Sequence, residues 1–465
     1  MCTRTRMHVL PSRHCLSPPR ANIHHSMTGF AQYPRFGLLA AVIACTVVQG
    51  ALGESRWANI AMAPPDPILG VAAAYNADPA TKKVNLGIGA YRDENGKPLV
   101  LRCVREAEKQ IANDESLNKE YIPIQGLEAF LKVTTDIIFG KESSAVKEGR
   151  VAVVQTLSGT GALRVAGGFL QKWHPGKNVY ISDPSWGNHH GIFQQCGMTT
   201  QAFRYLTPSM KLDIEGMLAD LRAADKGSIF VLHTVAHNPT GVDPSQEQWL
   251  LIAEVCKERE AIVIFDTAYQ GYASGDLEKD AWAVRYFVND LKMEVFVTQS
   301  YSKNFGLYGE RIGALSIVNL DDSTAEKVLS QLKAVIRPMY SSPQLHGARL
   351  VATVLNDESM TATWKSELKH MSDRIISMRV ELVNALSAVK CPPPNANFAD
   401  YSHITSQIGM FAYTGLSKDQ CHVLTDRFHI YCTKNGRFSM AGVNPGNVGF
   451  IAQAMKEAIA SAPQL

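Results

Sequence analysis

A lysine with chemically suggestive neighbours stands in the stretch Ser300-Tyr-Ser-Lys-Asn-Phe-Gly-Leu-Tyr-Gly-Glu-Arg311. Lys303 follows the apolar run 295–297, which predicts a buried strand, and precedes a glycine-containing loop. Partial burial and a cationic neighbour lower the pKa of an amine and make it a better nucleophile. Ser300 and Arg311 are donors that bind anions. The stretch predicts a reactive amine beside an anion site, although one lysine among 46 lysines and arginines is by itself usually a surface charge.

Four further predicted strands, at 151–155, 178–182, 228–233 and 261–265, are also followed by polar or aromatic side chains. The first strand is followed by Ser158-Gly159-Thr160, small residues that could bind an anion at a helix start, and the second by the aromatic ring of Trp186. The third is followed by the amide of Asn238, and the fourth by the acid Asp266 and the phenol Tyr269. Each group alone is common in loops or cores. In open α/β sheets, however, ligands bind outside the carboxyl ends of the strands. Together the five strand ends therefore predict one site.

This combination suits a flat, cationic aromatic ring that carries a phosphate and an aldehyde, namely pyridoxal 5′-phosphate (PLP). Lys303 would form a Schiff base with the aldehyde, and Asp266 would keep the ring nitrogen protonated. Asn238 and Tyr269 would hydrogen-bond the ring hydroxyl, Trp186 would stack on the ring, and the freed Lys303 amine would move a proton at the substrate α-carbon. The catalytic residues are thus Lys303, Asp266 and Tyr269. The phosphate ligands would be Ser158, Gly159, Thr160, Ser300 and Arg311.

Alternating strands and helices would position these residues. Helices are predicted at 102–113, 126–139, 160–173, 188–196 and 245–260, and longer ones at 322–336 and 360–390. Continuous apolar strands between amphipathic helices predict an α/β fold with a mainly parallel sheet covered on both faces. A smaller split α/β unit is expected at 405–465, with a strand at 408–412 and a closing helix from about 446. Residues 57–80 predict an extended arm.

The expected domain organisation follows from these elements. Residues 57–100 would form the N-terminal arm and part of a small domain. Residues 101–358 would form the large PLP-binding domain, and residues 359–465 the small C-terminal domain.

Composition narrows the functional classes. The 465 residues carry a formal net charge of +3, and residues 1–56 hold six arginines, no lysine and one acid. The remainder is therefore near neutrality, which gives no electrostatic basis for nucleic-acid binding. The nine cysteines show no CxxC pair and no Cys/His spacing typical of zinc,. We expect no metal.

Residues 1–56 are interpreted as a leader and excluded from the fold. Residues 1–36 are rich in Arg, Ser, His and Pro and lack acids, which is typical of an organellar targeting peptide,. The uncharged run 37–53 is also compatible with a secretory signal or, if retained, a short membrane anchor. An incorrect extension of the gene model is the third alternative. The mitochondrial matrix is the favoured location; the secretory pathway and the cytoplasm remain alternatives.

Eight stretches between Trp57 and the C-terminal region match a known pattern. They are Pro64-Pro-Asp-Pro-Ile-Leu69, Asn85-Leu-Gly-Ile-Gly-Ala-Tyr-Arg92, Leu157-Ser-Gly-Thr-Gly-Ala-Leu163, Trp186-Gly-Asn-His189, His237-Asn-Pro-Thr-Gly241, Asp266-Thr-Ala-Tyr-Gln-Gly271, 300–311, and Asn435-Gly-Arg-Phe-Ser-Met-Ala-Gly442. In them the chain resembles the aspartate aminotransferases of the class I, fold-type I PLP family. It is most similar to the eukaryotic mitochondrial and cytosolic members.

The resemblance implies residues that bind a dicarboxylic substrate. Arg437 matches the arginine that holds the α-carboxylate, and Arg337 matches one that reaches the side-chain carboxylate from a partner subunit. Tyr121 matches a tyrosine donated across the dimer to the phosphate. A homodimer with shared active sites is therefore implied. Gly89 should offer backbone near the carboxylate, and Trp186 and Asn238 would also bind the substrate. The supporting residues would be His189, His233 and Phe411.

The activity implied is aspartate:2-oxoglutarate transamination by a ping-pong cycle, with oxaloacetate and L-glutamate as products. An aromatic-amino-acid aminotransferase of the same fold and a non-catalytic, membrane-associated relative are the alternatives. Arg337 weighs against the first, and the intact set of Lys303, Asp266 and Arg437 weighs against the second. The chain departs from the family where Ser-Asn-Pro-Pro is usual, because here Ser341-Ser-Pro-Gln344 stands.

Overall fold

The computed structural model describes residues 55–64, 66 and 68–462. The predicted leader, including the apolar run 37–53, lies outside the described residues apart from its last two positions. The described residues before Pro65 belong to a separate unit, and the body that begins at Pro65 is described by itself. None of the helices in the described part of the chain combines the length and apolarity needed to cross a bilayer.

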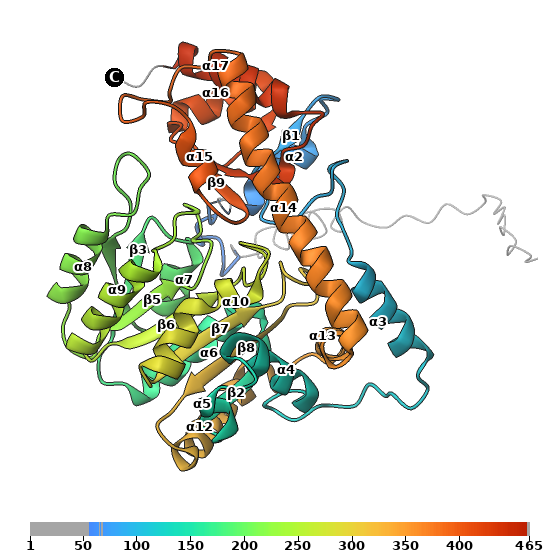
Figure 1. Cartoon of the computed structure of the whole chain (residues 1–465), viewed down its shortest axis with the longest axis vertical. Helices are drawn as coiled ribbons and strands as arrows, with labels where there is room; N and C mark the ends of the chain where they lie inside the picture. The colour runs from blue at the N-terminus through green and yellow to red at the C-terminus, as the bar shows by residue number, and fades with distance from the viewer. Residues whose placement is uncertain (1–54, 65, 67, 463–465) are drawn as a thin grey trace, which may run out of the picture. The chain divides into compact units, whose positions relative to one another are not determined.

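A seven-stranded sheet forms the centre of the body (Figure 1). Its spatial order is β2-β8-β7-β6-β5-β3-β4. The strands are β2 (Val151–Leu157), β3 (Asn178–Asp183), β4 (Thr199–Arg204), β5 (Ile229–His233), β6 (Ile262–Thr267), β7 (Val295–Ser300) and β8 (Ile312–Val318). β8 runs antiparallel to both of its neighbours, and the other neighbouring pairs are parallel. This is the mainly parallel sheet expected from the sequence.

Both faces of the sheet are covered, as the alternation of side chains in β5 shows. Phe230 and Leu232 pack in one hydrophobic cluster, whereas Ile229 and Val231 pack in another. Because successive strand residues point to opposite faces, each cluster must lie on its own side of the sheet. The first cluster includes helices α8 (Ile214–Ala223), α9 (Gln246–Glu258) and α11 (Trp282–Arg285); the second includes α6 (Ser158–Trp173), α7 (Asn188–Gln195) and α12 (Asp322–Tyr340).

A smaller part of the body is assembled from both ends of the chain. β1 (Val84–Asn85) pairs in parallel with β10 (Ile430–Tyr431), and β9 (Phe411–Tyr413) pairs with β11 (Arg437–Ser439). The surrounding helices are α2 (Leu69–Ala77), α15 (Ser402–Ser406), α16 (Lys418–Phe428), the short 3-10 helix η2 (Met440–Gly442) and α17 (Val448–Ser461). Residues more than 300 positions apart thus share one small sheet.

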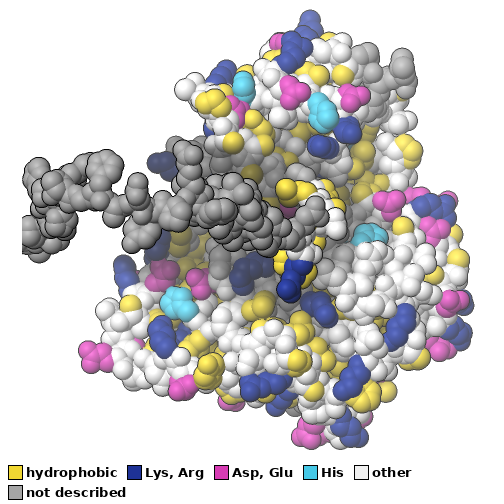
Figure 2. All heavy atoms as spheres, turned by 180° about the vertical axis from the view of Figure 1, so that it is seen from behind, with side chains coloured by type: hydrophobic (Ala, Val, Ile, Leu, Met, Phe, Trp, Pro, Cys, Tyr) yellow, Lys and Arg dark blue, Asp and Glu magenta, His cyan; other side chains and the backbone are white. Residues whose placement is uncertain are grey.

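The 31-residue helix α14 (Glu358–Ala388) links the two regions. It contacts α3 (Arg102–Asn113) and α13 (His346–Asn356), and also α15 and α17 (Figure 1). The other elements are α4 (Glu128–Phe139), α5 (Ser144–Lys147), α10 (Leu277–Asp280) and the π-helical turn η1 (Tyr286–Asp290). Basic and acidic side chains are both distributed over the face drawn in Figure 2.

Three expectations about local structure were wrong. The extended arm predicted over 57–80 contains α2, because Leu69–Ala77 is alanine-rich and the Asp66 carboxylate accepts hydrogen bonds from the Ile68 and Leu69 N–H groups,. The strand predicted at 408–412 is confined to β9, since the Ile408 N–H bonds to the Gly241 carbonyl instead. The helix predicted to end at 336 continues through Pro338. β4, α8 and α13 were not predicted.

Candidate active site

The carboxyl end of the sheet opens onto a cavity of about 180 Å³. Strands β2, β3, β5, β6 and β7 all end at this edge. Because β8 is antiparallel to them, its beginning lies at the same edge, which brings Arg311 next to the end of β7. The cavity is lined by Ser158, Gly159, Thr160, Trp186, His233, Val235, Asn238, Asp266, Ala268, Tyr269, Ser300, Ser302, Lys303 and Arg311.

Lys303 carries the amine at the centre of this cavity. Its Nζ lies 5.2 Å from the centroid of the Tyr269 ring. Burial lowers the pKa of Lys303 to about 8; the positive charges of Arg311 and Arg437 act in the same direction, and Asp266 opposes them. A larger fraction of this amine than of an ordinary lysine is therefore neutral, and so nucleophilic, near neutral pH.

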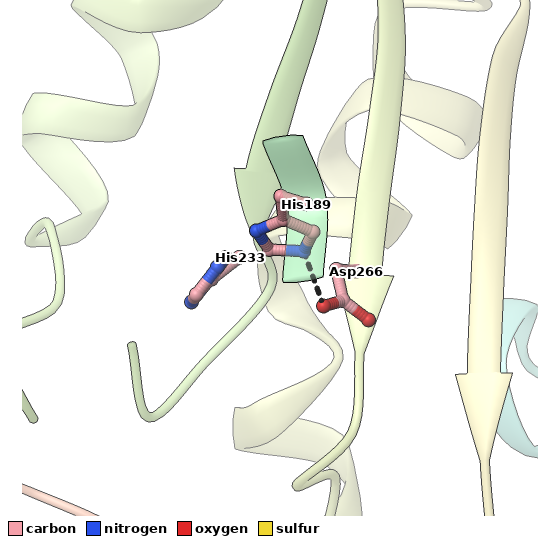
Figure 3. Close-up of side chains that lie close together, drawn as sticks. All are labelled: His189, His233 and Asp266. Carbon is pink, nitrogen blue, oxygen red and sulfur yellow. Dashed lines mark hydrogen bonds and ion pairs between the residues drawn. The ribbon is translucent and has the colours of Figure 1, made fainter. Parts of the chain in front are cut away.

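Asp266 is held by several hydrogen bonds, of which the one with His189 is drawn in Figure 3. His189 Nε2 lies 3.0 Å from Asp266 Oδ2, and His189 Nδ1 lies 3.0 Å from the Ser185 hydroxyl. The Thr298 hydroxyl donates to Oδ1 over 3.3 Å. Burial alone would raise the pKa of Asp266, but the hydrogen bond and charge of His189, together with smaller contributions from His233 and Lys303, leave the pKa below its usual value. Asp266 is thus an ionised carboxylate that can pair with a protonated ring nitrogen.

His233 lies against His189, with ring centroids 5.1 Å apart (Figure 3). Burial lowers the pKa of His233 to about 3, so that its ring is neutral. Potential ligand atoms of His189, His233 and Asp266 all lie within 4.8 Å of one another, a spacing that a metal ion could use. Both nitrogens of His189 are already engaged with Ser185 and Asp266, so the geometry favours orientation of the carboxylate.

A cluster of hydroxyls and one guanidinium forms an anion site. Ser158 begins α6, and its Oγ lies 2.8 Å from Ser300 Oγ and 3.0 Å from Ser302 Oγ. Arg311 Nη1 donates to Ser302 Oγ over 3.3 Å. The free N–H groups at the start of the 16-residue α6 add to the positive potential,. Ser158 and Arg311 both have positive φ values, 60° and 55°.

Arg437 provides a second, buried cation beside Asn238. Its Nη1 donates to Asn238 Oδ1 over 3.3 Å, its Nη2 donates to the Gly87 carbonyl over 2.8 Å, and its Cζ lies 4.0 Å from the centroid of the Phe411 ring. Burial lowers the pKa of Arg437 to about 10, so it is charged at neutral pH. Within the described residues it makes no salt bridge. An anionic substrate group is the natural partner for such a cation. A Cβ at Gly89 would lie 3.2 Å from Phe411 Cζ, so this glycine lets the backbone approach closely.

The structure brings together most of the site residues predicted from the sequence, but not all. Arg337 is exposed in the last turn of α12, where its guanidinium bonds to the Ser341 hydroxyl, and Tyr121 is 86% exposed. Neither lines the cavity of its own chain. Sequence reasoning did not assign Ser302 to the site, although its position next to Lys303 was a usable signal.

The cavity fits PLP group by group. It offers an amine that is partly neutral, an ionised carboxylate, an aromatic wall from Trp186, and a cluster of three hydroxyls with Arg311. The Trp186 ring meets His189 edge-on, with centroids 5.2 Å apart, which fixes this wall beside Asp266.

Comparison with known proteins agrees with this chemistry. A family model described as aminotransferase class I and II matches residues 81–455. The mitochondrial aspartate aminotransferase of Dictyostelium discoideum is 51% identical over 400 residues, which cover 86% of this chain and 92% of that protein. The solved aspartate aminotransferase from Saccharomyces cerevisiae cytoplasm is 43% identical with a TM-score of 0.84, covering 87% of this chain and 99% of that one.

An aromatic-amino-acid aminotransferase from Burkholderia pseudomallei, described as covalently bound to pyridoxal phosphate, is 42% identical with a TM-score of 0.83; the match covers 87% of this chain and 99% of that one. These similarities confirm the resemblance seen in the sequence and the fold-type I α/β architecture. The family depends on PLP, which confirms the expected cofactor. The matched segment makes up most of the chain and contains every residue that lines the cavity, so the protein belongs to the class I and II aminotransferases.

Proposed function

We propose that the protein is an aspartate:2-oxoglutarate aminotransferase. It interconverts L-aspartate and 2-oxoglutarate with oxaloacetate and L-glutamate in two half-reactions. The observation that carries the proposal is that the Lys303 amine and the Asp266 carboxylate line one cavity, and the buried Arg437 guanidinium lies close enough for its charge to act on Lys303. The likeness to aspartate aminotransferases over most of the chain supports the choice of substrate.

When bound, PLP supplies an electron-accepting ring that makes the substrate α-proton removable. The residues of this chain do the rest. Asp266 keeps the ring nitrogen protonated, and Lys303 anchors the cofactor and then moves the proton at the α-carbon. Trp186 would stack on the ring, and Asn238 and Tyr269 would hydrogen-bond its hydroxyl. The phosphate would be held by Ser158, Gly159, Thr160, Ser300 and Arg311.

Arg437 binds the α-carboxylate, next to Gly89 and Asn238. The second carboxylate of aspartate requires another cation, which we assign to Arg337 of a partner subunit. Arg337 and Tyr121 are both exposed and lie outside the cavity of their own chain, as residues donated to a neighbouring site must. The proposal therefore includes a homodimer in which each active site is completed by the other subunit, with 101–358 as the large domain and 359–465 plus part of 57–100 as the small one.

Aromatic transamination is the second candidate, supported by the similarity to the Burkholderia enzyme. An exposed arginine available for a second carboxylate favours aspartate instead. For the location we propose the mitochondrial matrix, from the acid-free, arginine-containing composition of residues 1–36. Relatives occur both in mitochondria and in the cytoplasm. Sequencing the mature N-terminus tests this location: a start near residues 54–60 supports cleavage, and an intact 37–53 contradicts it.

A steady-state assay of the purified protein with PLP tests the proposed reaction. L-aspartate, L-phenylalanine and L-alanine are each paired with 2-oxoglutarate, and L-glutamate is paired with oxaloacetate. We expect kcat/KM to be highest for the dicarboxylic pairs, with parallel lines in double-reciprocal plots. A preference for phenylalanine over aspartate would support the aromatic alternative.

A further inference from the structure

Gln344 contacts the backbone of Arg311. Gln344 lies between α12 and α13. Its side-chain nitrogen donates to the carbonyl oxygen of Arg311 and also lies 3.4 Å from the carbonyl oxygen of Glu310. Both neighbours are acceptors, so only the NH₂ end of the amide can face them.

The backbone that Gln344 contacts is in an unfavourable conformation. Arg311 has a φ of 55°, in the left-handed region that L-residues other than asparagine and aspartate seldom occupy,. Such a conformation persists only where surrounding contacts fix it. The Gln344 amide supplies one such contact from outside the 301–311 loop. The direction of the Arg311 side chain depends on this backbone.

Gln344 is itself anchored to the central sheet. The backbone carbonyl oxygen of Gln344 accepts a hydrogen bond of 2.6 Å from Gln155 Nε2, and Gln155 is fully buried in β2. The Oε1 of Gln155 accepts from the Leu127 N–H over 3.1 Å. The Tyr340 hydroxyl donates to the Gln155 carbonyl over 3.3 Å. The segment 340–344 is thus fixed to β2 at two points before it reaches Arg311.

The side chain of Arg311 contacts the hydroxyl cluster of the anion site. Its Nη1 donates to Ser302 Oγ, which lies 3.0 Å from Ser158 Oγ. We propose that Gln344 is a positioning residue that holds the left-handed backbone of Arg311 and so directs its guanidinium to the cofactor phosphate. The inference rests on the proposed role of Arg311 as a phosphate ligand.

The test compares two ligands that differ only in the phosphate. Apoprotein is titrated with PLP and with pyridoxal, and binding is followed by absorbance. Gln344→Met keeps the length of the side chain but removes the donor. We expect it to weaken PLP binding about three- to tenfold, the size of effect typical of one lost hydrogen bond, and to change pyridoxal binding less than about twofold. Gln344→Glu, which places an acceptor against two carbonyls, should give the same selective loss or a larger one.

Two controls make the result specific. Gln453→Met alters an exposed glutamine on α17 and should leave both affinities unchanged. Arg311→Met should abolish most of the preference for PLP over pyridoxal. Equal weakening of both ligands by Gln344→Met, or no weakening, would overturn the inference. If Arg311→Met removes the preference and neither Gln344 variant does, only the role of Gln344 fails. If Arg311→Met leaves the preference intact, the proposed phosphate site itself fails.

Discussion

His189 and Asp266 form a 3.0 Å contact directly behind the cavity, and the imidazole is fixed on its other side by Ser185. This contact is the largest of the effects that lower the pKa of Asp266 against its burial. The proposed role of Asp266 depends on its negative charge, because a neutral group could not hold a proton on the cofactor ring.

Asp266→Asn should therefore lower kcat by about 10²- to 10³-fold, the loss typical when one preorganised electrostatic group is removed. The amide is isosteric with the carboxylate, so the fold should be unaffected. The measurement is kcat with aspartate and 2-oxoglutarate at saturating PLP. Asp183→Asn, at the exposed end of β3, is the matched control. Wild-type turnover in Asp266→Asn would refute the assignment.

Lys303→Ala should reduce transamination by at least about 10³-fold, because it removes both the covalent anchor and the proton-transfer group. The visible absorbance of the lysine-linked cofactor should disappear as well. Lys434→Ala, which changes a lysine on an exposed turn, should retain both properties. A Lys303→Ala protein that keeps full turnover is incompatible with the mechanism.

Arg337→Ala should discriminate between substrates. It removes charge-assisted hydrogen bonds to the second carboxylate, so kcat/KM for aspartate should fall about 100-fold. Phenylalanine has no second carboxylate, and its kcat/KM should change less than about threefold. Arg437→Ala should impair both donors, since both carry an α-carboxylate. Equal losses for the two donors in Arg337→Ala would contradict the proposed contact.

The pKa of Lys303, about 8, predicts a pH dependence for the apoprotein. A lysine is protonated below its pKa and reactive above it, so acylation of Lys303 should rise between pH 7 and 9 and then level off. Competitive labelling followed by peptide mass spectrometry measures this, with exposed lysines of the same digest as the reference. Arg311→Met removes a positive charge that lowers this pKa, and should move the midpoint to higher pH. If the pH midpoint for acylation of Lys303 equals that of the exposed lysines, the lowering of its pKa by burial is contradicted.

A stability prediction concerns Arg379, which is fully buried on α14. Its guanidinium donates to the carbonyls of Ile404, Gly409 and Phe411. Arg379→Met leaves these carbonyls without their donor, which costs roughly 3 kcal/mol or more. Thermal unfolding should show a clearly lower Tm, whereas Arg427→Met on the exposed face of α16 should not. An unchanged Tm for Arg379→Met would show that other donors replace the guanidinium.

Much of the site was predictable because its residues follow strands in sequence. Ser158, Asp266 and Lys303 each stand at or just beyond a recognisable apolar run, and the geometry of a parallel sheet brings such positions together. Without the family resemblance, Arg437 was not predictable. Its burial depends on Phe411 and on the Gly87 carbonyl, which lies 350 residues away in the chain.

Other features failed for different physical reasons. The helix α2 was missed because prolines precede it and its apolar positions lack a helical period. The extended strand at 408–412 was wrong for another reason: apolar residues indicated a strand, but tertiary hydrogen bonds to Gly241 and Arg379 determined the backbone path. Gln344 was visible only as an unusual residue, because its partner Arg311 lies 33 positions earlier in the chain.

The antiparallel orientation of β8 has a consequence for how the site can change. β7 and β8 are adjacent, with Ser300 opposite Gly313, so residues 301–311 form a hairpin loop and need no helical crossover. The Lys303 amine and the Arg311 guanidinium therefore belong to one short covalent unit. Helices that cover the sheet can shift or lengthen without altering the separation of these two groups. Insertions within this hairpin, by contrast, would change the distance between the Lys303 amine and the Arg311 guanidinium.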